Sequence, residues 1–458
     1  MTMLATRRDA YAAVLTLVVV STLLSMVAYT GPLGNAVTLT AVLDAGAAGR
    51  TWILASISVG LAVTLLAAGV IADRIGRRKV FELGAAFFVV ANLLCAAAPS
   101  AGVFIAARIV AGVGATGMIA TGLGLVASTP GSHKHQARTS TAWSASMGAG
   151  IAVGPVLAGL FDELDGWRWF YALLALGGAA TWAGTRTLAP TTDAPKTPHP
   201  FDGVGFVLLT ATLGAAVSAI VEVRNGLTGS TLALFVTAVV LAAAFGASQR
   251  FGPRQLIPLT VLAHRPFIAA TIAGLGTGLG VIAVMAFAPS YLAGDLGLST
   301  LQAGLLMTLW SGTSAVAALV LARHAARMTG TTQLILGLIG VALGMALLVA
   351  PESALGHTRF VVGLLVAGVA SGLLNGGLAR QAVASVPAAF AATGTAATNT
   401  ARYIGAAIGV SAASITAATA GPDTGWTRIA VTGAALSLAA AAMVLTLERG
   451  TAPASREA

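Results

Sequence analysis

The chain has 458 residues, of which 57% are hydrophobic and only 9% are charged, and its mean hydropathy is +0.89. These values exclude an ordinary soluble globular domain and predict an integral membrane protein. The net charge of +10 does not indicate nucleic-acid binding, because the basic residues are scattered between apolar segments and form no basic face with interleaved aromatic residues. The single cysteine, Cys95, excludes an intramolecular disulfide, a CxxC redox pair and a thiolate metal cluster.

Apolar segments of about 18 to 25 residues recur along the chain, and this is the length that crosses a bilayer as a helix. We therefore predict an all-α integral membrane protein. Its fourteen predicted spans lie near residues 10–31, 50–72, 80–98, 101–127, 139–161, 168–186, 203–222, 229–248, 266–291, 300–322, 331–349, 359–384, 391–418 and 426–446. The stretch APSAG separates the third and fourth spans, because Pro and Gly interrupt helices.

The distribution of basic residues predicts the orientation of these spans. With both termini in the cytoplasm, 18 of the 25 Lys and Arg residues fall inside, 5 fall outside and 2 lie within helices. An excess of Lys and Arg on the cytoplasmic side is the rule for membrane proteins. Twelve spans would give the same orientation, but 203–222 and 229–248 are each apolar and long enough to cross, which favours fourteen. The preference for Arg over Lys and the abundance of Ala, Gly and Val favour the cytoplasmic membrane of a high-GC bacterium.

The chain divides into six predicted units. They are an N-terminal six-helix bundle (1–186), a cytoplasmic linker (187–202), two additional helices (203–248), a cytoplasmic loop (249–265), a C-terminal six-helix bundle (266–446) and a cytoplasmic tail (447–458). Weak similarity between the second and tenth spans supports two related halves. Repeated bundles around a central cavity are a common plan among transporters.

The stretch GVIADRIGRRKV, residues 69–80, concentrates charge at the cytoplasmic end of the second span. Gly69 permits close helix packing, Asp73 lies at the membrane edge and Gly76 permits a tight turn. Four cations complete the group: Arg74, Arg77, Arg78 and Lys79. Positive-inside anchoring alone is the alternative interpretation, and it explains the cations but not Asp73 or the spacing.

This stretch resembles the signature loop of the major facilitator superfamily. The resemblance implies the major facilitator fold, with two six-helix bundles and two additional central helices. It also implies that the acid of the loop pairs with an arginine and with a helix end of the opposite half, and so closes the cytoplasmic side in the outward-open state. Such an interfacial pair can form in one conformation and break in the other.

Two arginines lie inside predicted spans, where an unpaired cation costs about 2.5 to 3.5 kcal/mol on insertion scales. Arg108 lies in the fourth span, should face a cavity, and with Gly112 and Gly114 resembles the family motif RxxxGxG. Substrate contact or proton relay is its implied role, and a static structural partner is the alternative. Arg402 lies in ATGTAATNTARYIGAAIG, which, like GWRWFYALLAL earlier in the chain, resembles the fourteen-helix drug:proton antiporter branch.

The fifth span carries small residues and a proline along one face, at Gly150, Gly154, Pro155 and Gly159. Small residues let a neighbouring helix approach closely, and proline bends the helix. This face resembles the motif GxxxGPxxGG of the antiporter branches, with Ala158 in place of one glycine, and the resemblance favours export. Plain helix packing is the alternative.

The first span lacks the acid that proton-driven exporters of this branch commonly carry. Aligned on Asn35, the family pattern places Thr30 at the position of that acid. Proton coupling, if present, is predicted to use Asp73 or Glu222, or to act indirectly through Arg108 and Arg402. The alternative for Glu222 is an interfacial residue beside Arg224.

Polar and aromatic residues near mid-membrane are candidates for the wall of a substrate cavity. They suit a bulky, weakly polar ligand, through ring stacking and adaptable thioether contacts. Because few acids lie in the membrane, neutral, zwitterionic or anionic substrates are expected to suit the cavity better than polycations. The candidates are Tyr29, Asn35, Trp143, Met285, Phe287, Trp310, Asn375 and Asn399.

We predict a monomeric secondary active transporter that exports drug-like or natural-product small molecules by alternating access, in exchange for protons. An importer or uncoupled facilitator of a small metabolite is the alternative within the same superfamily. An enzyme is not predicted, because paired carboxylates, a His-rich metal site and an activated nucleophile are missing from the sequence. No cofactor or metal is expected, and the lack of a GxxxxGK[ST] loop excludes ATP as the direct energy source.

Overall fold

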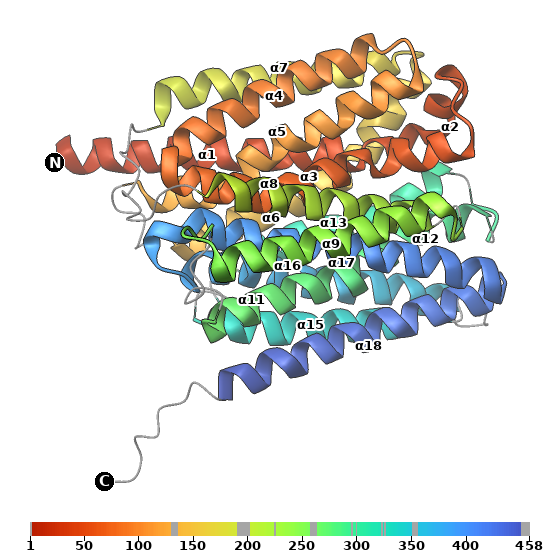
Figure 1. Ribbon diagram of the computed structural model, residues 1–458. Coiled ribbons are helices and arrows are strands. Elements are labelled where there is room, and N and C mark those ends of the chain that lie inside the picture. The colour runs from red at the N-terminus through yellow and green to blue at the C-terminus, as the bar shows by residue number, and fades with distance from the viewer. Residues whose placement is uncertain are drawn as a thin grey trace, which may run out of the picture.

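The computed structural model describes residues 2–129, 136–189, 202–223, 226–256, 263–294, 296–298, 300–321, 324, 327–349 and 356–449. The described chain is almost entirely helical, and most helices run along one common axis (Figure 1). The first half forms α1 (Thr2–Thr30), α2 (Pro32–Val42), α3 (Ala47–Ile75), α4 (Arg77–Ala97), α5 (Ala101–Ala127), α6 (Gln136–Glu163) and α7 (Trp167–Leu188).

The remaining helices form a separate pair and a second bundle. The pair is α8 (Gly203–Glu222) and α9 (Gly229–Phe251). The bundle contains α11 (Arg265–Gly276), the π-helix η3 (Thr277–Ile282), α12 (Ala283–Gly294), α13 (Thr300–Val320), α15 (Gly330–Leu347), α16 (Gly356–Ala384), the 3-10 helix η4 (Ala388–Phe390), α17 (Ala391–Ala420) and α18 (Pro422–Arg449). Because α11, η3 and α12 follow one another without a break, they form one long helical unit with a π-helical centre.

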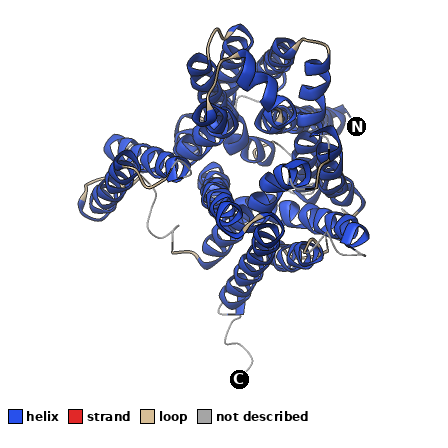
Figure 2. Cartoon of the chain, turned by 90° about the vertical axis from the view of Figure 1, so that its right-hand side faces the viewer, coloured by secondary structure: helices blue, strands red, loops and turns tan. Residues whose placement is uncertain are grey.

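Each half has its own hydrophobic core. One core gathers buried side chains mainly from α1 to α7, and the rings of Phe104, Phe170 and Tyr171 meet edge to face within it. The other gathers side chains from α11 to α18, where Tyr291 and Trp426 stack at 4.8 Å. The view along the helices shows the two groups, with the α8–α9 pair standing to one side (Figure 2). The structure therefore contains two helical bundles and an additional helix pair, as the sequence predicted.

Twelve described helices are long and apolar enough to cross a membrane, whereas the sequence predicted fourteen spans. The two predicted spans outside that set are α7 and α17. In α7, Trp and Arg residues lower the hydropathy, and in α17 Thr, Gly and Ala replace large aliphatic residues. Both helices nevertheless extend through the bundle (Figure 1). The number of membrane spans that we predict therefore remains fourteen.

Helix boundaries lie close to the predicted ones, with differences at the ends. α9 continues to Phe251 and α18 to Arg449, so the predicted cytoplasmic loop and tail begin later than residues 249 and 447. α7 ends at Leu188, and residues 190–201 of the predicted linker lie outside the described part of the chain. The first span continues past Gly31 as α2, with a kink at Asn35, whose φ of −139° and ψ of 24° are not helical.

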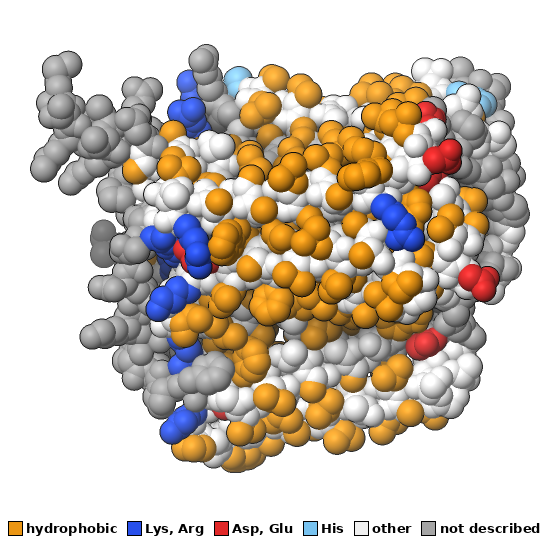
Figure 3. Space-filling model, turned by 90° about the horizontal axis from the view of Figure 1, so that it is seen from above, with side chains coloured by type: hydrophobic (Ala, Val, Ile, Leu, Met, Phe, Trp, Pro, Cys, Tyr) orange, Lys and Arg blue, Asp and Glu red, His pale blue; other side chains and the backbone are white. Residues whose placement is uncertain are grey.

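Charged side chains gather at the two ends of the bundle. The space-filling view shows Lys and Arg mainly toward one end, Asp and Glu toward the other, and a hydrophobic and uncharged surface between them (Figure 3). We call the first the basic end; it includes the α3–α4 turn. The opposite end includes the C-terminal end of α6, where Asp162 and Glu163 lie. An apolar belt between two charged ends is the surface expected of a protein that spans a bilayer.

Candidate functional site

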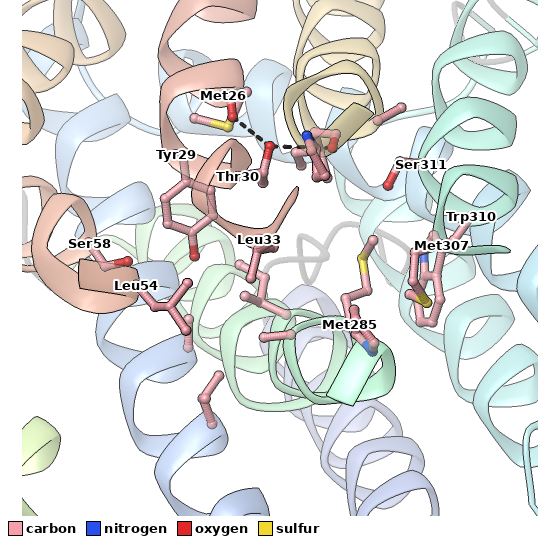
Figure 4. A pocket seen from close by; sticks show the side chains of 18 of the residues that line it. Met26, Tyr29, Thr30, Leu33, Leu54, Ser58, Met285, Met307, Trp310 and Ser311 are labelled. Carbon is pink, nitrogen blue, oxygen red and sulfur yellow. Dashed lines mark hydrogen bonds between the residues drawn. The ribbon is translucent and has the colours of Figure 1, made fainter. Parts of the chain in front are cut away.

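A cavity of about 680 Å³ lies between the two bundles. Its wall comes from α1, α2, α3, α6 and α8 on one side and from η3, α12, α13, α16 and α17 on the other. Most lining residues are apolar, and thioether and aromatic side chains are prominent. Figure 4 shows Tyr29, Leu33, Leu54 and Ser58 across the cavity from Met285, Met307 and Trp310. The volume and the character of the wall suit a drug-sized molecule.

The cavity is closed toward the basic end by contacts between the halves. Gly69 of α3 lies so close to Ala392 and Ala396 of α17 that a side chain at position 69 would collide with them. The Ser144 hydroxyl of α6 donates to the carbonyl of Gly372 on α16 at 3.1 Å. Close backbone approach over small residues leaves no passage for a ligand between these helices.

The cavity is open toward the opposite end. Three leucines line it there from three helices: Leu33 of α2, Leu160 of α6 and Leu305 of α13. They are 38%, 52% and 51% exposed, so solvent reaches this part of the wall. The cavity is therefore open at one end and closed at the other.

Asp73 joins α3 to the beginning of α17, across the two halves. Its Oδ2 accepts hydrogen bonds from the Thr393 amide at 2.8 Å and the Thr393 hydroxyl at 2.9 Å, and its Oδ1 accepts one from the Ala392 amide at 3.2 Å. The carboxylate is 1% exposed. It satisfies amides that have no partner inside α17 and lies at the positive end of the dipole of that helix.

Arg77 completes this contact, which we call the latch (Asp73, Arg77, Ala388, Ala392 and Thr393). Its Nε and Nη2 lie 3.2 and 3.1 Å from Asp73 Oδ1. Nη2 also donates to the Ala388 carbonyl at 2.6 Å, and Nη1 donates to the Gly124 carbonyl of α5 at 3.1 Å. The latch therefore holds three helices of one half to the start of α17 in the other.

The other residues of the signature loop support the turn rather than the latch. Gly76 has a φ of +107°, a conformation that favours glycine, between α3 and α4. Arg78 pairs with Glu82 at 2.9 Å and donates to the Arg186 carbonyl at 2.8 Å, which ties α4 to α7 within one half. Arg74, at the end of α3, is partly exposed at the basic end.

Arg108 does not face the cavity, contrary to the expectation from the sequence. It is 1% exposed and is absent from the cavity wall. Its Nε donates to the Ile53 carbonyl and to the Ser56 hydroxyl, both at 3.2 Å, and its Nη1 donates to the Ala28 carbonyl at 3.1 Å. The guanidinium thus binds α5 to α3 and α1 through oxygen acceptors, which is the alternative role that the sequence left open.

Arg402 does line the cavity. It is 6% exposed, and Nη1 lies 3.0 Å from Met147 Sδ of α6, a weak acceptor. Its buried Nε has no hydrogen-bond partner among the described residues. The side chains of Tyr29 and Tyr403 are its electrostatic neighbours, and their rings meet edge to face at 6.1 Å.

The small-residue face of α6 packs against α1 and α2. Side chains at Gly150 and Gly154 would collide with α1 at Met26 and Thr30, and Gly34 of α2 lies directly on the Pro155 carbonyl. Pro155 and Gly159 also line the cavity. This face therefore brings the first helix against the cavity.

Thr30, at the position predicted for the missing acid, compensates for Pro155. Proline has no N–H, so the Ile151 carbonyl one turn earlier loses its helical partner. The Thr30 hydroxyl lies 3.3 Å from that carbonyl and 3.0 Å from the Met26 carbonyl, so it donates between the two (Figure 4). An ionised aspartate at position 30 has no proton to donate there.

The predicted cavity residues divide into two groups. Tyr29, Met285, Phe287, Trp310 and Asn375 line the cavity. Trp310 is held by a hydrogen bond from its Nε1 to the Ser371 hydroxyl at 2.9 Å.

Asn35, Trp143 and Asn399 do not line the cavity, which corrects the sequence-based expectation. All three are buried, Asn35 at the kink of α2 and Trp143 within the N-terminal core. Asn399 donates instead to the Thr395 carbonyl of its own helix at 2.9 Å. The residue type alone did not indicate which face of the helix each side chain occupies.

Glu222 lies at the last position of α8 and is partly buried. Val217 and Val221 of the same helix line the cavity, but Glu222 does not. Arg224, its predicted neighbour, lies outside the described residues. Among the described residues, two acids line the cavity, Asp162 and Glu163, and both are at the open end.

Several lining residues were not predicted from the sequence. They are small hydroxyl residues and an aromatic residue: Ser58, Thr277, Ser311, Ser371 and Tyr403. Tyr403 follows Arg402 directly, so this dipeptide inside an otherwise apolar helix was the available signal. The hydroxyl residues carry little signal, because Ser and Thr also occur in membrane helices bonded to their own backbone.

A sequence profile of the Major Facilitator Superfamily matches residues 17–410 of the chain. The Multidrug efflux pump LfrA of Mycolicibacterium smegmatis is 29% identical over 362 residues, which cover 79% of this chain and 71% of the pump. The Probable actinorhodin transporter of Streptomyces coelicolor is 30% identical over 374 residues, which cover 78% of this chain and 64% of that transporter.

Solved structures of two transporters share the fold. The human organic anion transporter MFSD10 (TETRAN) superposes with a TM-score of 0.68 at 16% identity, covering 95% of this chain and 99% of that one. The proton:xylose symporter XylE superposes with a TM-score of 0.68 at 15% identity, covering 96% of both chains. At these identities the likeness supports the arrangement of helices alone.

Proposed function

Because the chain belongs to the major facilitator superfamily, we propose that it exports drug-like or natural-product small molecules across the cytoplasmic membrane by alternating access, in exchange for protons. The chain is a multi-pass membrane transporter and not an enzyme. The observation that carries the proposal is a drug-sized cavity between the halves, open at one end and closed at the other by the latch.

The basic end indicates the orientation of the chain, and the names of the relatives support export. By the positive-inside rule we expect this end to face the cytoplasm, so that both termini would lie there and the structure would be outward-open. Relatives that are named a multidrug efflux pump and a probable actinorhodin transporter support the export of small molecules. In this scheme the latch breaks when the cavity opens to the cytoplasm, and one copy of the chain in the bilayer suffices, since the cavity is built from its own two halves.

Uncoupled facilitated transport is the second candidate, and one observation favours it. At the position of the acid expected in the first helix, Thr30 instead satisfies the Ile151 carbonyl. The acids on the cavity wall, Asp162 and Glu163, stand at the open end rather than beside Arg402. Asp73 and Glu222 then remain as the carboxylates through which protons could be coupled.

Proteoliposomes that contain a pH-sensitive dye distinguish the two candidates. A proton gradient is imposed, and the dye signal and drug uptake are followed for a panel of aromatic compounds. Proton-coupled export predicts that drug addition discharges the gradient. The Asp73→Asn variant should slow this discharge about tenfold, whereas Asp44→Asn, the same substitution at an exposed position, should leave it intact. Drug movement without proton flux would refute the coupling and favour the facilitator.

A further inference from the structure

We propose that the substrate carries one negative charge on an apolar aromatic body, and that the guanidinium of Arg402 binds this anionic group inside the cavity. The inference rests on the proposed transport function and assigns a substrate class to the same cavity. A carboxylate, or another anion with two oxygens side by side, matches the planar fork of arginine.

The surroundings of Arg402 leave the cation without a matching anion. Each of the ion pairs found in the described part of the chain, Asp73 with Arg77, Arg78 with Glu82 and Arg186 with Glu82, involves other residues. The hydrogen-bond acceptor of Arg402 is the sulfur of Met147, and its Nε has no partner among the described residues. A buried cation in this state is incompletely satisfied, so a bound anion would improve its environment.

The position of Arg402 makes it accessible to a ligand. It belongs to the cavity wall, together with Tyr29, Ser58 and Tyr403. The hydroxyl groups of these neighbours can donate hydrogen bonds to an anion. Neutral polar groups elsewhere on the wall, such as Thr277 and Ser371, add no charge that would compete for the guanidinium.

The acids of the cavity wall are too far along α6 to neutralise Arg402. Nη1 of Arg402 contacts Met147, and Asp162 follows Met147 by fifteen residues on the same helix. At 1.5 Å per residue the two levels are about 22 Å apart. One oxygen of Asp162 is also engaged, since it accepts a hydrogen bond from Thr38 at 2.7 Å. The deep part of the cavity is therefore positively charged.

The rest of the wall fits an aromatic body. Met26, Met285 and Met307 supply thioethers, and Trp310 supplies a large ring fixed by its hydrogen bond to Ser371 (Figure 4). Methionine adapts to different aromatic shapes, and aromatic side chains stack on planar ligands. The charge at Arg402 thus selects for an acid, while the remaining wall tolerates varied ring systems.

Three matched fluorescent probes test the proposal on the full chain in nanodiscs. Dansylglycine carries one negative charge, dansylglycinamide is its neutral counterpart, and dansyl-ethylenediamine carries one positive charge. We expect dansylglycine to bind at least tenfold more tightly than either of the other two. Equal affinities, or tighter binding of the amide or the amine, would overturn the proposal, and empty nanodiscs give the background from the lipid.

Variants at position 402 test the assignment to this side chain. Arg402→Gln should abolish the preference for the acid, Arg402→Lys should retain part of it, and Arg428→Gln, at an exposed position of α18, should leave it unchanged. An acid preference that survives in a folded Arg402→Gln protein would overturn the assignment. If Arg402→Gln folds poorly, the proposal can still be tested, because the three probes are first compared on the unmodified protein.

Transport of the three probes in proteoliposomes separates this inference from the proposed function. Faster transport of dansylglycine than of the amide supports both. Transport of the amide or the amine without preference for the acid would keep the export function and refute the anionic substrate. Specific binding of dansylglycine without movement of any probe would keep the anion site and refute transport.

Discussion

Arg108 and Arg402 are both buried arginines inside membrane helices, one in each half of the molecule, and they are 1% and 6% exposed. Arg108 donates to three oxygen acceptors of α1 and α3 and lies off the cavity, although its Nη2 has no hydrogen-bond partner among the described residues. Arg402 lies on the cavity wall and has a sulfur as its acceptor. Burial alone therefore does not distinguish the two arginines, whereas the kind of acceptor and the contact with the cavity do.

Removing the charge of Arg108 tests the structural side of this comparison and should have the largest effect on stability. Arg108→Gln breaks charged hydrogen bonds to buried carbonyls and should lower the free energy of unfolding by about 3 to 5 kcal/mol. Thermal unfolding of the purified protein, followed by tryptophan fluorescence, measures this. Arg428→Gln is the matched exposed control. A loss below about 1 kcal/mol would mean that the carbonyls find other donors and that Arg108 is not a structural clamp.

Asp73 of the latch is a third buried charged residue, and its partners come from both halves. Breaking the latch should therefore shift the equilibrium between the open and closed states of the cavity. Asp73→Asn removes the charge that faces Arg77 and the amides of α17, and transport should fall about tenfold, equivalent to about 1.4 kcal/mol. The conformation in which the cavity is open opposite the basic end should also become less populated.

Cysteine labelling measures that shift directly. A cysteine at the exposed Leu160 position should react with a maleimide more slowly in the Asp73→Asn background than in the unmodified background. The single native cysteine, Cys95, is buried, and Cys95→Ser removes any remaining signal from it. Unchanged or faster labelling would show that the latch does not stabilise the open state.

The Thr30 hydroxyl offers a smaller effect that involves no charge. Thr30→Val removes the donor to the Ile151 carbonyl and should lower the free energy of unfolding by about 1 kcal/mol, while Thr30→Ser should retain most of it. Pro155→Ala restores the missing N–H, so the loss from Thr30→Val should shrink in the double variant. Additive losses in this cycle, measured by the same unfolding assay, would contradict the pairing of Thr30 with the proline-freed carbonyl.

The smallest expected change in stability is at Arg402, and it sharpens the contrast with Arg108. Arg402→Gln should change the free energy of unfolding by less than about 1 kcal/mol, because the guanidinium has few interactions to lose and its burial is costly. The same tryptophan-fluorescence unfolding assay checks this. A loss as large as that of Arg108→Gln would show that Arg402 is a structural clamp as well.

The sequence predicted the class of fold and the residues of the signature loop, because those depend on local patterns. Hydropathy over a span depends on composition alone, and the turn at Gly76 depends on a few adjacent residues. The contact of Asp73 with α17 could be expected only from the family resemblance, since 319 positions separate Asp73 from Ala392.

The cavity wall could not be predicted as well, because it depends on how each helix is rotated about its axis. Arg108 and Arg402 look alike in the sequence, yet one lies against carbonyls of neighbouring helices and the other beside open space. Asn35 and Asn399 were expected at the cavity because they are polar. Instead, Asn35 lies at the kink of α2, and Asn399 donates a hydrogen bond to the backbone of its own helix. Contacts between helices decide such cases, and a single sequence does not show them.

The π-helical segment η3 interrupts a long helical unit beside the cavity, and Thr277, Val281 and Ile282 of this segment line the wall. A π-helix holds more residues per turn than an α-helix, so tightening this segment would shift the register of everything after it by one residue. One residue corresponds to about 100° of rotation in an α-helix. Met285 and Phe287 would then leave the wall without any tilt of the bundle. A change of register in this segment would therefore alter the cavity wall without opening or closing either end.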